Sequence, residues 1–496
     1  MNVLLIEPPF YSLQGIKSGK VSLGLAMLAG AIKEKGGDVS IYSPDLEFDT
    51  ETVNSEGVVT HMNRGYLKCM EERLTGLLSE LKPDVVGISV WTARYNNGLL
   101  IARIVRETCG NRIKIVMGGI HATMLPEDAL DNMDVDYIVV CEGERAIVEL
   151  LDHLENNPPN LGNGVRNLYY RDENNAIRST EKAYIKNLDS LPLPAYEKYL
   201  NYEQLDPNMF GSLISARGCP FLCTYCASHI IWSRKVRFHS PEDIIELIGY
   251  LYHTFGTRKF RFNDDTFNLD RNRLFRLCRL LAKVKQPIEW EADIRGDLAD
   301  YDSLKAMRDA GCYQVNIGVE TASETIIKQV RKNLDLEKVK DTFRICKEMR
   351  VRTTGYFMIG FPGETEEQVN KTIALIEELK PDNPIISIFI PYPGTEAFDN
   401  AVRNGEIDTG ALDWDQFFHH SENANYSGAI SDQNWGMLVK RADRVRERIL
   451  LMNKIREKVQ HTDFITRYIK NGPMVFFKDI VTVSRMLSWF LKNRTR

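Results

Sequence analysis

Three cysteines in one short loop are the residues whose type and spacing point most directly to chemistry. Cys219, Cys223 and Cys226 fall within the run S-A-R-G-C-P-F-L-C-T-Y-C, which begins at Ser215. Thiolates are the preferred ligands of iron–sulfur clusters. Three thiolates can hold a cluster of four irons and leave one iron open to a small molecule. The spacing therefore favours a catalytic cluster over a purely structural one.

Two other interpretations of this loop stay open on spacing alone. His229 extends the run to C-x-x-x-C-x-x-C-x-x-H, and three cysteines with one histidine make a common closed zinc site. The cysteines could also be ordinary buried residues. We expect the six cysteines outside the motif to be ordinary buried residues, because they show no metal or disulfide spacing. Unpaired cysteines of this kind indicate a reducing, cytoplasmic environment. The six are Cys69, Cys109, Cys141, Cys278, Cys312 and Cys346.

The C-x-x-x-C-x-x-C motif, with Tyr225 before its third cysteine, resembles the signature of the radical S-adenosylmethionine (SAM) superfamily. The resemblance implies a 4Fe-4S cluster held by the three cysteines, with SAM on the open iron. One electron from the reduced cluster then cleaves SAM to methionine and a 5′-deoxyadenosyl radical. An electron donor such as flavodoxin or ferredoxin is implied as a partner.

The elements around the motif agree with the six-stranded partial (β/α) barrel that this resemblance implies. Six apolar segments alternate with helical ones: Ser212–Ala216, Lys259–Phe262, Ile288–Ala292, Gln314–Val319, Thr353–Ile359 and Ile385–Ile390. In such barrels, ligands bind where the strands end. Besides Tyr225, the resemblance predicts SAM contacts by four residues at these ends: Asp264, Arg295, Glu320 and Gly360. We expect Glu364, slightly further on, to cap the following helix.

The chain before the cysteines predicts a second α/β domain. Apolar segments alternate with helical ones at Val3–Ile6, Val39–Tyr42, Val85–Val90, Ile113–Met117 and Tyr137–Val140. This order predicts a doubly wound, flavodoxin-like parallel sheet. Ligands of such sheets bind at the carboxyl ends of the strands.

Small and polar residues follow three of these strands and look like the cobalamin-binding domain of one radical SAM subgroup. The resemblance implies cobalamin contacts by Ser89, Thr92, Gly118, Gly119, His121, Glu142 and Gly143. The glycines could equally serve tight turns alone. Two positions depart from the subgroup. Cys141 replaces its usual glycine, and the loop after the first strand lacks a histidine for cobalt. We expect His121 to pack rather than to bind the metal.

The sequence thus predicts four regions. Residues 1–155 form the cobalamin-binding domain, 156–205 a linker with a small hairpin, 206–404 the partial barrel, and 405–496 a mostly helical extension. No run approaches the roughly 20 apolar residues of a membrane-spanning helix. The amphipathic segment Met474–Leu491, followed by basic residues, is expected either to pack on the barrel or to lie on an anionic membrane.

The formal net charge of −5 gives no argument for nucleic acid as a partner. The two resemblances together imply an enzyme that uses SAM and cobalamin to methylate an unactivated carbon of a small-molecule or lipid-like substrate. Two alternatives stay open. One is an oxidative cyclase with the same cofactors, and the other is a non-catalytic sensor that binds a corrinoid or zinc.

Overall fold

The computed structural model describes residues 1–10, 21–47, 64–156, 161, 164–414, 417 and 424–460. The chain divides into two compact units. One comprises Met1–Ala292 with Ile390–Phe418, and the other Asp293–Phe389 with His419–Arg496. The four regional boundaries expected from the sequence stay a prediction.

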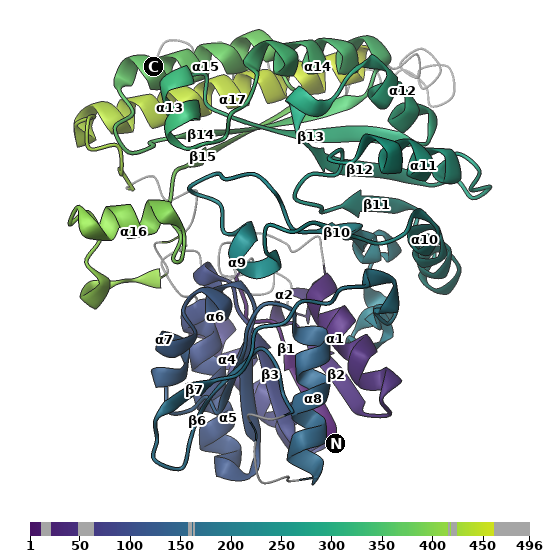
Figure 1. The fold of residues 1–496 in the computed structure, drawn as a ribbon, viewed down its shortest axis with the longest axis vertical. Coiled ribbons are helices and arrows are strands. Elements are labelled where there is room, and N and C mark those ends of the chain that lie inside the picture. Colours follow the sequence, from purple (N-terminus) through teal and green to yellow (C-terminus); the bar gives the residue numbers. More distant parts are fainter. Residues whose placement is uncertain are drawn as a thin grey trace. The chain divides into compact units, whose positions relative to one another are not determined.

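A seven-stranded sheet forms the N-terminal part of the first unit, in the order β2-β1-β3-β4-β5-β6-β7 (Figure 1). Its strands are β1 (Asn2–Ile6), β2 (Asp38–Tyr42), β3 (Val85–Ser89), β4 (Lys114–Gly118), β5 (Tyr137–Val139), β6 (Leu168–Arg171) and β7 (Ile177–Ser179). Strands β1 to β5 pair in parallel, whereas β6 and β7 are antiparallel. The predicted parallel sheet is confirmed, and the predicted hairpin extends its edge.

The helices of this sheet are α1 (Leu23–Glu34), α2 (Pro44–Glu47), α4 (Arg64–Leu81), α5 (Tyr95–Cys109), α6 (Ile120–Met124), α7 (Pro126–Asp131) and α8 (Gly143–Asn156). Helix α1 begins where the Ser22 hydroxyl accepts the N–H of Leu25, at 3.3 Å. Helix α1 packs beside α8, and α4 packs beside α5 (Figure 1). The helices cover both faces of the sheet, so β1 is buried along its length and its sequence is continuously apolar from Val3 to Ile6.

A second sheet has the order β15-β14-β13-β12-β11-β8, which confirms the six predicted strands. They are β8 (Ser212–Leu213), β11 (Lys259–Phe262), β12 (Glu289–Ile294), β13 (Cys312–Glu320), β14 (Arg352–Ile359) and β15 (Asn383–Ile388). The helices of this part of the chain are α9 (Ser228–Trp232), α10 (Pro241–Phe255), α11 (Arg271–Leu281), α12 (Tyr301–Asp309), α13 (Glu324–Gln329), α14 (Leu336–Met349), α15 (Glu366–Leu379), α16 (Glu396–Arg403) and α17 (Asp432–Gln460).

The first barrel strand is shorter than the sequence predicts. Strand β8 ends at Leu213, and the next extended segment, β9 (Ala216–Arg217), pairs instead with β10 (Arg237–Phe238) in a separate antiparallel pair. The cause lies at Ser215, whose backbone N–H donates to the Asp264 carboxylate at 2.6 Å rather than to a neighbouring strand.

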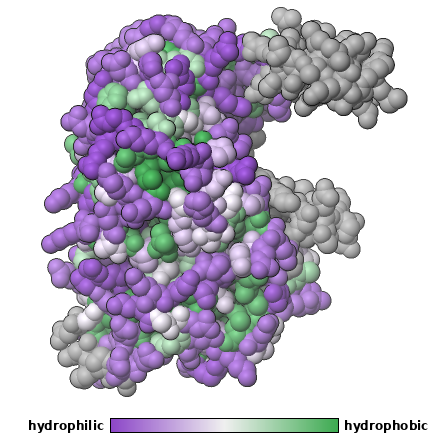
Figure 2. Space-filling model, turned by 90° about the vertical axis from the view of Figure 1, so that its right-hand side faces the viewer, coloured by the Kyte–Doolittle hydropathy of each residue, from purple (hydrophilic) through white to green (hydrophobic). Residues whose placement is uncertain are grey.

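On the face shown in Figure 2, hydrophilic side chains predominate and small hydrophobic areas lie between them. Within the described residues, no helix combines the length and the apolar character needed to cross a bilayer. The amphipathic segment Met474–Leu491 lies outside the described residues, so both expectations for it stay predictions.

Candidate active site

The cysteine loop connects β9 to α9 in the first unit. Cys219, Cys223 and Cys226 are free thiols, and each is partly exposed. Gly218 begins the loop at a φ of 101°, where a Cβ would lie 2.7 Å from the carbonyl oxygen of Lys235. Only glycine suits this turn. The backbone N–H of Cys226 donates to the carbonyl of Cys223 at 3.3 Å, which folds the second half of the loop back on itself.

The three sulfur atoms do not surround a single point as the ligands of a bound zinc ion do. Four ligands around zinc, at about 2.3 Å from the metal, lie roughly 4 Å from one another. Among the described residues, only Asp189, His239 and Asp243 bring three ligand atoms within 4.8 Å of one another. The three cysteines are spread more widely than that. His229, the fourth ligand of the zinc alternative, has its Nδ1 3.0 Å from the carbonyl oxygen of Cys226.

Burial favours the protonated form of two thiols in this loop. Burial raises the pKa of Cys226 to about 12, and burial also raises the pKa of Cys219. Because iron binds the thiolate form, assembly of a cluster must release these protons.

Two adjacent aspartates hold the ends of the cysteine loop. Asp264 is fully buried and accepts hydrogen bonds from the backbone N–H of Ser215 at 2.6 Å and from its hydroxyl at 2.5 Å. Burial raises the pKa of Asp264 to about 6, although the bonds from Ser215 oppose this shift. Asp265 accepts from the hydroxyl of Ser228, the first residue of α9, at 2.5 Å. The predicted SAM contact of Asp264 stays a prediction, while its described bonds give it a positioning role.

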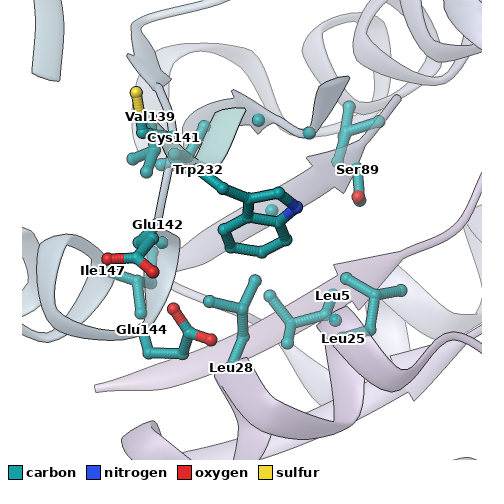
Figure 3. Close-up of a pocket in the computed structure, with 17 residues that line it drawn as sticks. Leu5, Leu25, Leu28, Ser89, Val139, Cys141, Glu142, Glu144, Ile147 and Trp232 are labelled. Atoms are coloured by element: carbon teal, nitrogen blue, oxygen red, sulfur yellow. The ribbon is translucent and has the colours of Figure 1, made fainter. Parts of the chain in front are cut away.

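A cavity, partly open to solvent, lies at the carboxyl ends of the strands of the N-terminal sheet (Figure 3). Its walls are largely apolar, with Leu5 on β1, Leu25 and Leu28 on α1, and Ile147 on α8. The indole of Trp232, the last residue of α9, faces these side chains across the cavity (Figure 3). The cavity therefore offers an apolar interior with a polar rim, which suits a large amphiphilic ligand.

Five of the seven residues predicted to contact cobalamin line this cavity, namely Ser89, Gly118, Gly119, Glu142 and Gly143. Two of these glycines are required for different structural reasons. Gly119 has a φ of 97°, and a Cβ there would lie 2.5 Å from the carbonyl oxygen of Val90. A Cβ on Gly143 would lie 3.1 Å from Leu28, so this glycine allows α1 and α8 to pack closely.

Thr92 and His121 are not among the lining residues. The Nδ1 of His121 lies 3.4 Å from the Thr92 hydroxyl. The imidazole stacks on Tyr95, with ring centroids 4.0 Å apart, and meets the edge of Trp414. Burial lowers the pKa of His121 to about 3, so the ring is neutral. These contacts pack His121 within the protein, and the predicted cobalamin contacts of Thr92 and His121 stay predictions.

The carboxylate of Glu142 is turned into the protein rather than offered to a ligand. It accepts from Arg217 at 2.9 Å and from Arg237 at 2.8 Å, and its side chain is fully buried. Neighbouring Glu144 accepts from Arg217 at 2.5 Å. Burial alone would raise the pKa of Glu144, but the Arg217 guanidinium holds it below its usual value.

Two known protein families match this chain, one over the cysteine loop and the other over most of the cavity wall. The Radical SAM superfamily profile matches residues 213–376, which include the cysteine loop, and the B12 binding domain profile matches residues 19–151, which include most of the cavity wall. The chain is a radical SAM protein with an N-terminal B12-binding domain.

Several relatives align with most of this chain. An uncharacterized methyltransferase of Pyrococcus horikoshii is 29% identical over 424 residues, which cover 84% of this radical SAM protein and 86% of the relative. The anaerobic magnesium-protoporphyrin IX monomethyl ester cyclase of Cereibacter sphaeroides is 27% identical over 423 residues, covering 82% and 64%. In fold, the chain is similar to TsrM, a radical SAM methyltransferase from Kitasatospora setae, with a TM-score of 0.64, 16% identity and coverage of 81% and 78%.

The remaining SAM contacts predicted for this radical SAM protein lie in the second unit. Arg295 donates to Asp297 at 2.8 and 3.1 Å, and to the carbonyl oxygens of Lys332 and Asn333 at 2.7 and 2.8 Å. Its guanidinium thus braces the protein backbone. Glu320 ends β13 with a φ of 67° and pairs with Lys332 at 2.6 Å. The left-handed conformation is strained for a residue other than glycine, and the ion pair with Lys332 helps to hold it.

Gly360 directly follows β14 and has a φ of 89°, and a Cβ there would lie 2.7 Å from the ring of Trp435. The expectation that Glu364 caps the following helix is wrong. The side chain of Thr365 caps α15, while Glu364 accepts from the backbone N–H groups of Gly360 and Phe361 at 2.6 and 3.1 Å. Glu364 therefore holds the end of the strand that precedes Gly360.

Sequence reasoning missed part of the cavity wall. Leu25 and Leu28 repeat at helical spacing, which cannot be told from an ordinary core face. Trp232 follows the last motif cysteine by six residues and belongs to no motif, so no signal in the sequence marks it.

Proposed function

We propose that this protein is a radical SAM enzyme that cleaves SAM and, with cobalamin, methylates an unactivated carbon of a small molecule. The cofactor assignment is a 4Fe-4S cluster on Cys219, Cys223 and Cys226, with SAM at the open iron and cobalamin in the cavity of the N-terminal sheet. The observation that carries the proposal is that the two sites share an element. Helix α9 begins directly after the cysteines and ends at Trp232 in the cavity wall.

Bound at these sites, the cluster supplies the electron that cleaves SAM, and cobalamin supplies a carrier for the methyl group. The side chains of the chain position these groups and keep water away. Asp264 and Asp265 fix the two ends of the cysteine loop through Ser215 and Ser228. The apolar walls of the cavity exclude water from the ligand inside.

The predicted SAM contacts form part of this proposal. Tyr225 lies in the cysteine loop beside the proposed cluster ligands. We assign the carboxylate of Glu320 to the ribose or ammonium of SAM, and Gly360 to the adenine. Arg295 and Asp264 support these contacts by holding the strand ends, because their described bonds go to the protein.

The substrate is a small molecule, which includes lipid-like compounds, and the electron comes from a protein donor of the flavodoxin or ferredoxin type. The net charge of −5 gives no support for a nucleic-acid substrate. Contact with an anionic membrane through Met474–Leu491 is a further part of the proposal that vesicle co-sedimentation can test.

The test is anaerobic incubation of the reconstituted enzyme with cobalamin, a reductant, a metabolite extract and SAM carrying a trideuterated methyl group. The proposal predicts 5′-deoxyadenosine together with a product heavier by one labelled methyl group. The Cys223→Ala variant should yield neither. A chain that binds a cluster and SAM but forms no 5′-deoxyadenosine with any extract would contradict the proposal.

An oxidative cyclase is the second candidate, favoured by the likeness to the cyclase of Cereibacter sphaeroides. It would also form 5′-deoxyadenosine, but its product would carry no label from SAM and would lose hydrogen. A non-catalytic sensor would bind its ligand without cleaving SAM. The same experiment therefore separates all three functions.

A further inference from the structure

Four buried charges join the wall of the cavity to the cysteine loop. Glu142 and Glu144 lie at the start of α8, and both line the cavity. Arg217 donates to both, at 2.9 and 2.5 Å, and Arg237 donates to both oxygens of Glu142 at 2.8 Å. The two carboxylates and two guanidiniums balance in charge, and each side chain is at most one-tenth exposed.

Trp232 is held by both arginines of this group. Its ring lies over the Arg217 guanidinium, with the ring centroid 4.8 Å from Cζ, which is a cation–π contact. Its carbonyl oxygen accepts from Nη2 of Arg237 at 3.1 Å. The indole itself projects into the cavity (Figure 3).

The cysteine loop lies in sequence between Arg217, which binds the two glutamates of the cavity wall, and Trp232, which lines the cavity itself. Arg217 precedes Cys219 by two residues, and Trp232 follows Cys226 by six. Trp232 is partly exposed along the cavity, so a ligand there would cover its ring. Separating Arg217 from its two glutamates would cost much free energy, because it would leave buried charges unpaired. Because Arg217 is held in place, we expect a movement of the Trp232 ring to displace α9 and the cysteine loop before it rather than Arg217.

We infer that Trp232 and Arg217 are positioning residues that couple occupancy of the cavity to the cysteine loop, so that a corrinoid in the cavity strengthens SAM binding at the loop. This inference rests on the proposed function. Arg217 is already held by its glutamates, so a ligand that packs against Trp232 restrains the ring and the carboxyl end of α9, which Arg217 and Asp265 hold only in part. SAM then binds a loop whose following helix is restrained at both of its ends. By thermodynamic linkage, SAM must strengthen corrinoid binding by the same factor.

The test measures the Kd of radiolabelled SAM by equilibrium dialysis on the oxidised, reconstituted protein, with and without saturating hydroxocobalamin. No turnover occurs under these conditions, so the readout is independent of activity. We expect hydroxocobalamin to lower the Kd of SAM by about fivefold or more in the wild type. In Trp232→Leu, hydroxocobalamin at a saturating concentration should leave the Kd of SAM unchanged, with the iron content per chain retained.

Tyr184→Leu is the matched control. The Tyr184 ring lies over Arg237 at 5.2 Å, on the same charge group, but it is not part of the cavity wall. This variant should keep the full response to hydroxocobalamin. Arg217→Lys is the second test variant, because lysine keeps the charge but cannot bind both glutamates in a fork. It should reduce the response even if Trp232→Leu fails to fold.

The outcomes separate the inference from the function on which it rests. Wild-type protein that binds hydroxocobalamin and SAM independently overturns the coupling and leaves the proposed function standing. Persistence of the response in both Trp232→Leu and Arg217→Lys overturns it as well, as does an equal loss in Tyr184→Leu. Wild-type protein that binds no corrinoid overturns both the cofactor assignment and the inference.

Discussion

Asp264 and Glu364 are buried carboxyl groups whose oxygens accept hydrogen bonds from the backbone of the protein itself. Asp264 holds Ser215 before the cysteine loop, and Glu364 holds Gly360 at the end of β14. Neither arrangement leaves a carboxylate poised for proton transfer on a substrate. At the scale of the residue, the described polar groups fix loops and strand ends, which suits a protein whose chemistry is supplied by cofactors.

The cysteine loop gives the first prediction at this scale. Cys223→Ala should lower the iron content of anaerobically reconstituted protein from about four atoms per chain to background, because two thiolates cannot hold the cluster. The N-terminal sheet should remain folded and still bind hydroxocobalamin. Cys109→Ser, at the end of α5, is the control and should keep its iron. Stoichiometric zinc and no iron in the wild type would contradict the cluster assignment.

Glu364 gives a prediction about pH. Burial raises its pKa from 4.5 to about 7, so the folded state binds this proton more tightly than the unfolded state does. Stability from this group is therefore full below the unfolded pKa of 4.5 and is lost as pH rises through the folded pKa of about 7. The glutamine side chain of Glu364→Gln has no charge at any of these pH values, so this variant should not lose stability as the pH rises.

Relative to wild type, the Glu364→Gln variant should gain stability between about pH 5 and about pH 8, by up to about 3 kcal/mol. Denaturation midpoints of the two proteins, measured anaerobically across this range, check the prediction. A difference between the midpoints that does not change with pH would show that the carboxyl group titrates normally in the fold.

At the scale of the element, the sequence predicts strands best where both faces are covered. Strand β1 is apolar at every position from Val3 to Ile6 because helices pack on both sides of it. The prediction fails at Ser215, where a side chain distant in sequence, Asp264, takes the backbone hydrogen bond and ends the strand early. Local periodicity carries no information about such a bond.

In the candidate site, too, features set by local sequence can be predicted, whereas features set by contacts between distant residues cannot. Its cysteines and the glycines Gly118, Gly119 and Gly143 can be found from sequence, because their spacing follows from local turns and strand ends. Trp232 and Leu28 cannot, because their roles depend on how α9 and α1 pack around the cavity. Glu142 lines the cavity, but the two arginines that bind its carboxylate lie far away in the sequence, so its local motif does not reveal them.

The loop after β4 gives the prediction for this scale. Gly119→Ala should destabilise the protein by about 1–3 kcal/mol and weaken corrinoid binding, because its φ of 97° and the nearby carbonyl of Val90 leave no room for a methyl group. Gly76→Ala, within α4, meets no atom within 4 Å and should instead stabilise by up to about 1 kcal/mol. Thermal midpoints of both variants give the comparison. Equal effects would contradict the assignment of strain to Gly119.

At the scale of the whole molecule, the cysteine loop and the cavity belong to one compact unit. Helix α9, the Arg217 ion pairs and the Trp232 ring all join these two sites within Met1–Ala292. A cluster and a corrinoid bound there would be neighbours. A protein that merely carried two independent domains would have no need of these shared contacts.

The most direct test of this claim is electron paramagnetic resonance of protein reconstituted with iron and cobalamin and then reduced with dithionite. We predict that the Co(II) signal relaxes faster and broadens when the cluster is paramagnetic, because two unpaired spins close together interact. In Cys223→Ala, which lacks the cluster, the Co(II) signal should be unperturbed. A Co(II) signal that is identical in the wild type with a reduced cluster and in this variant would contradict the account.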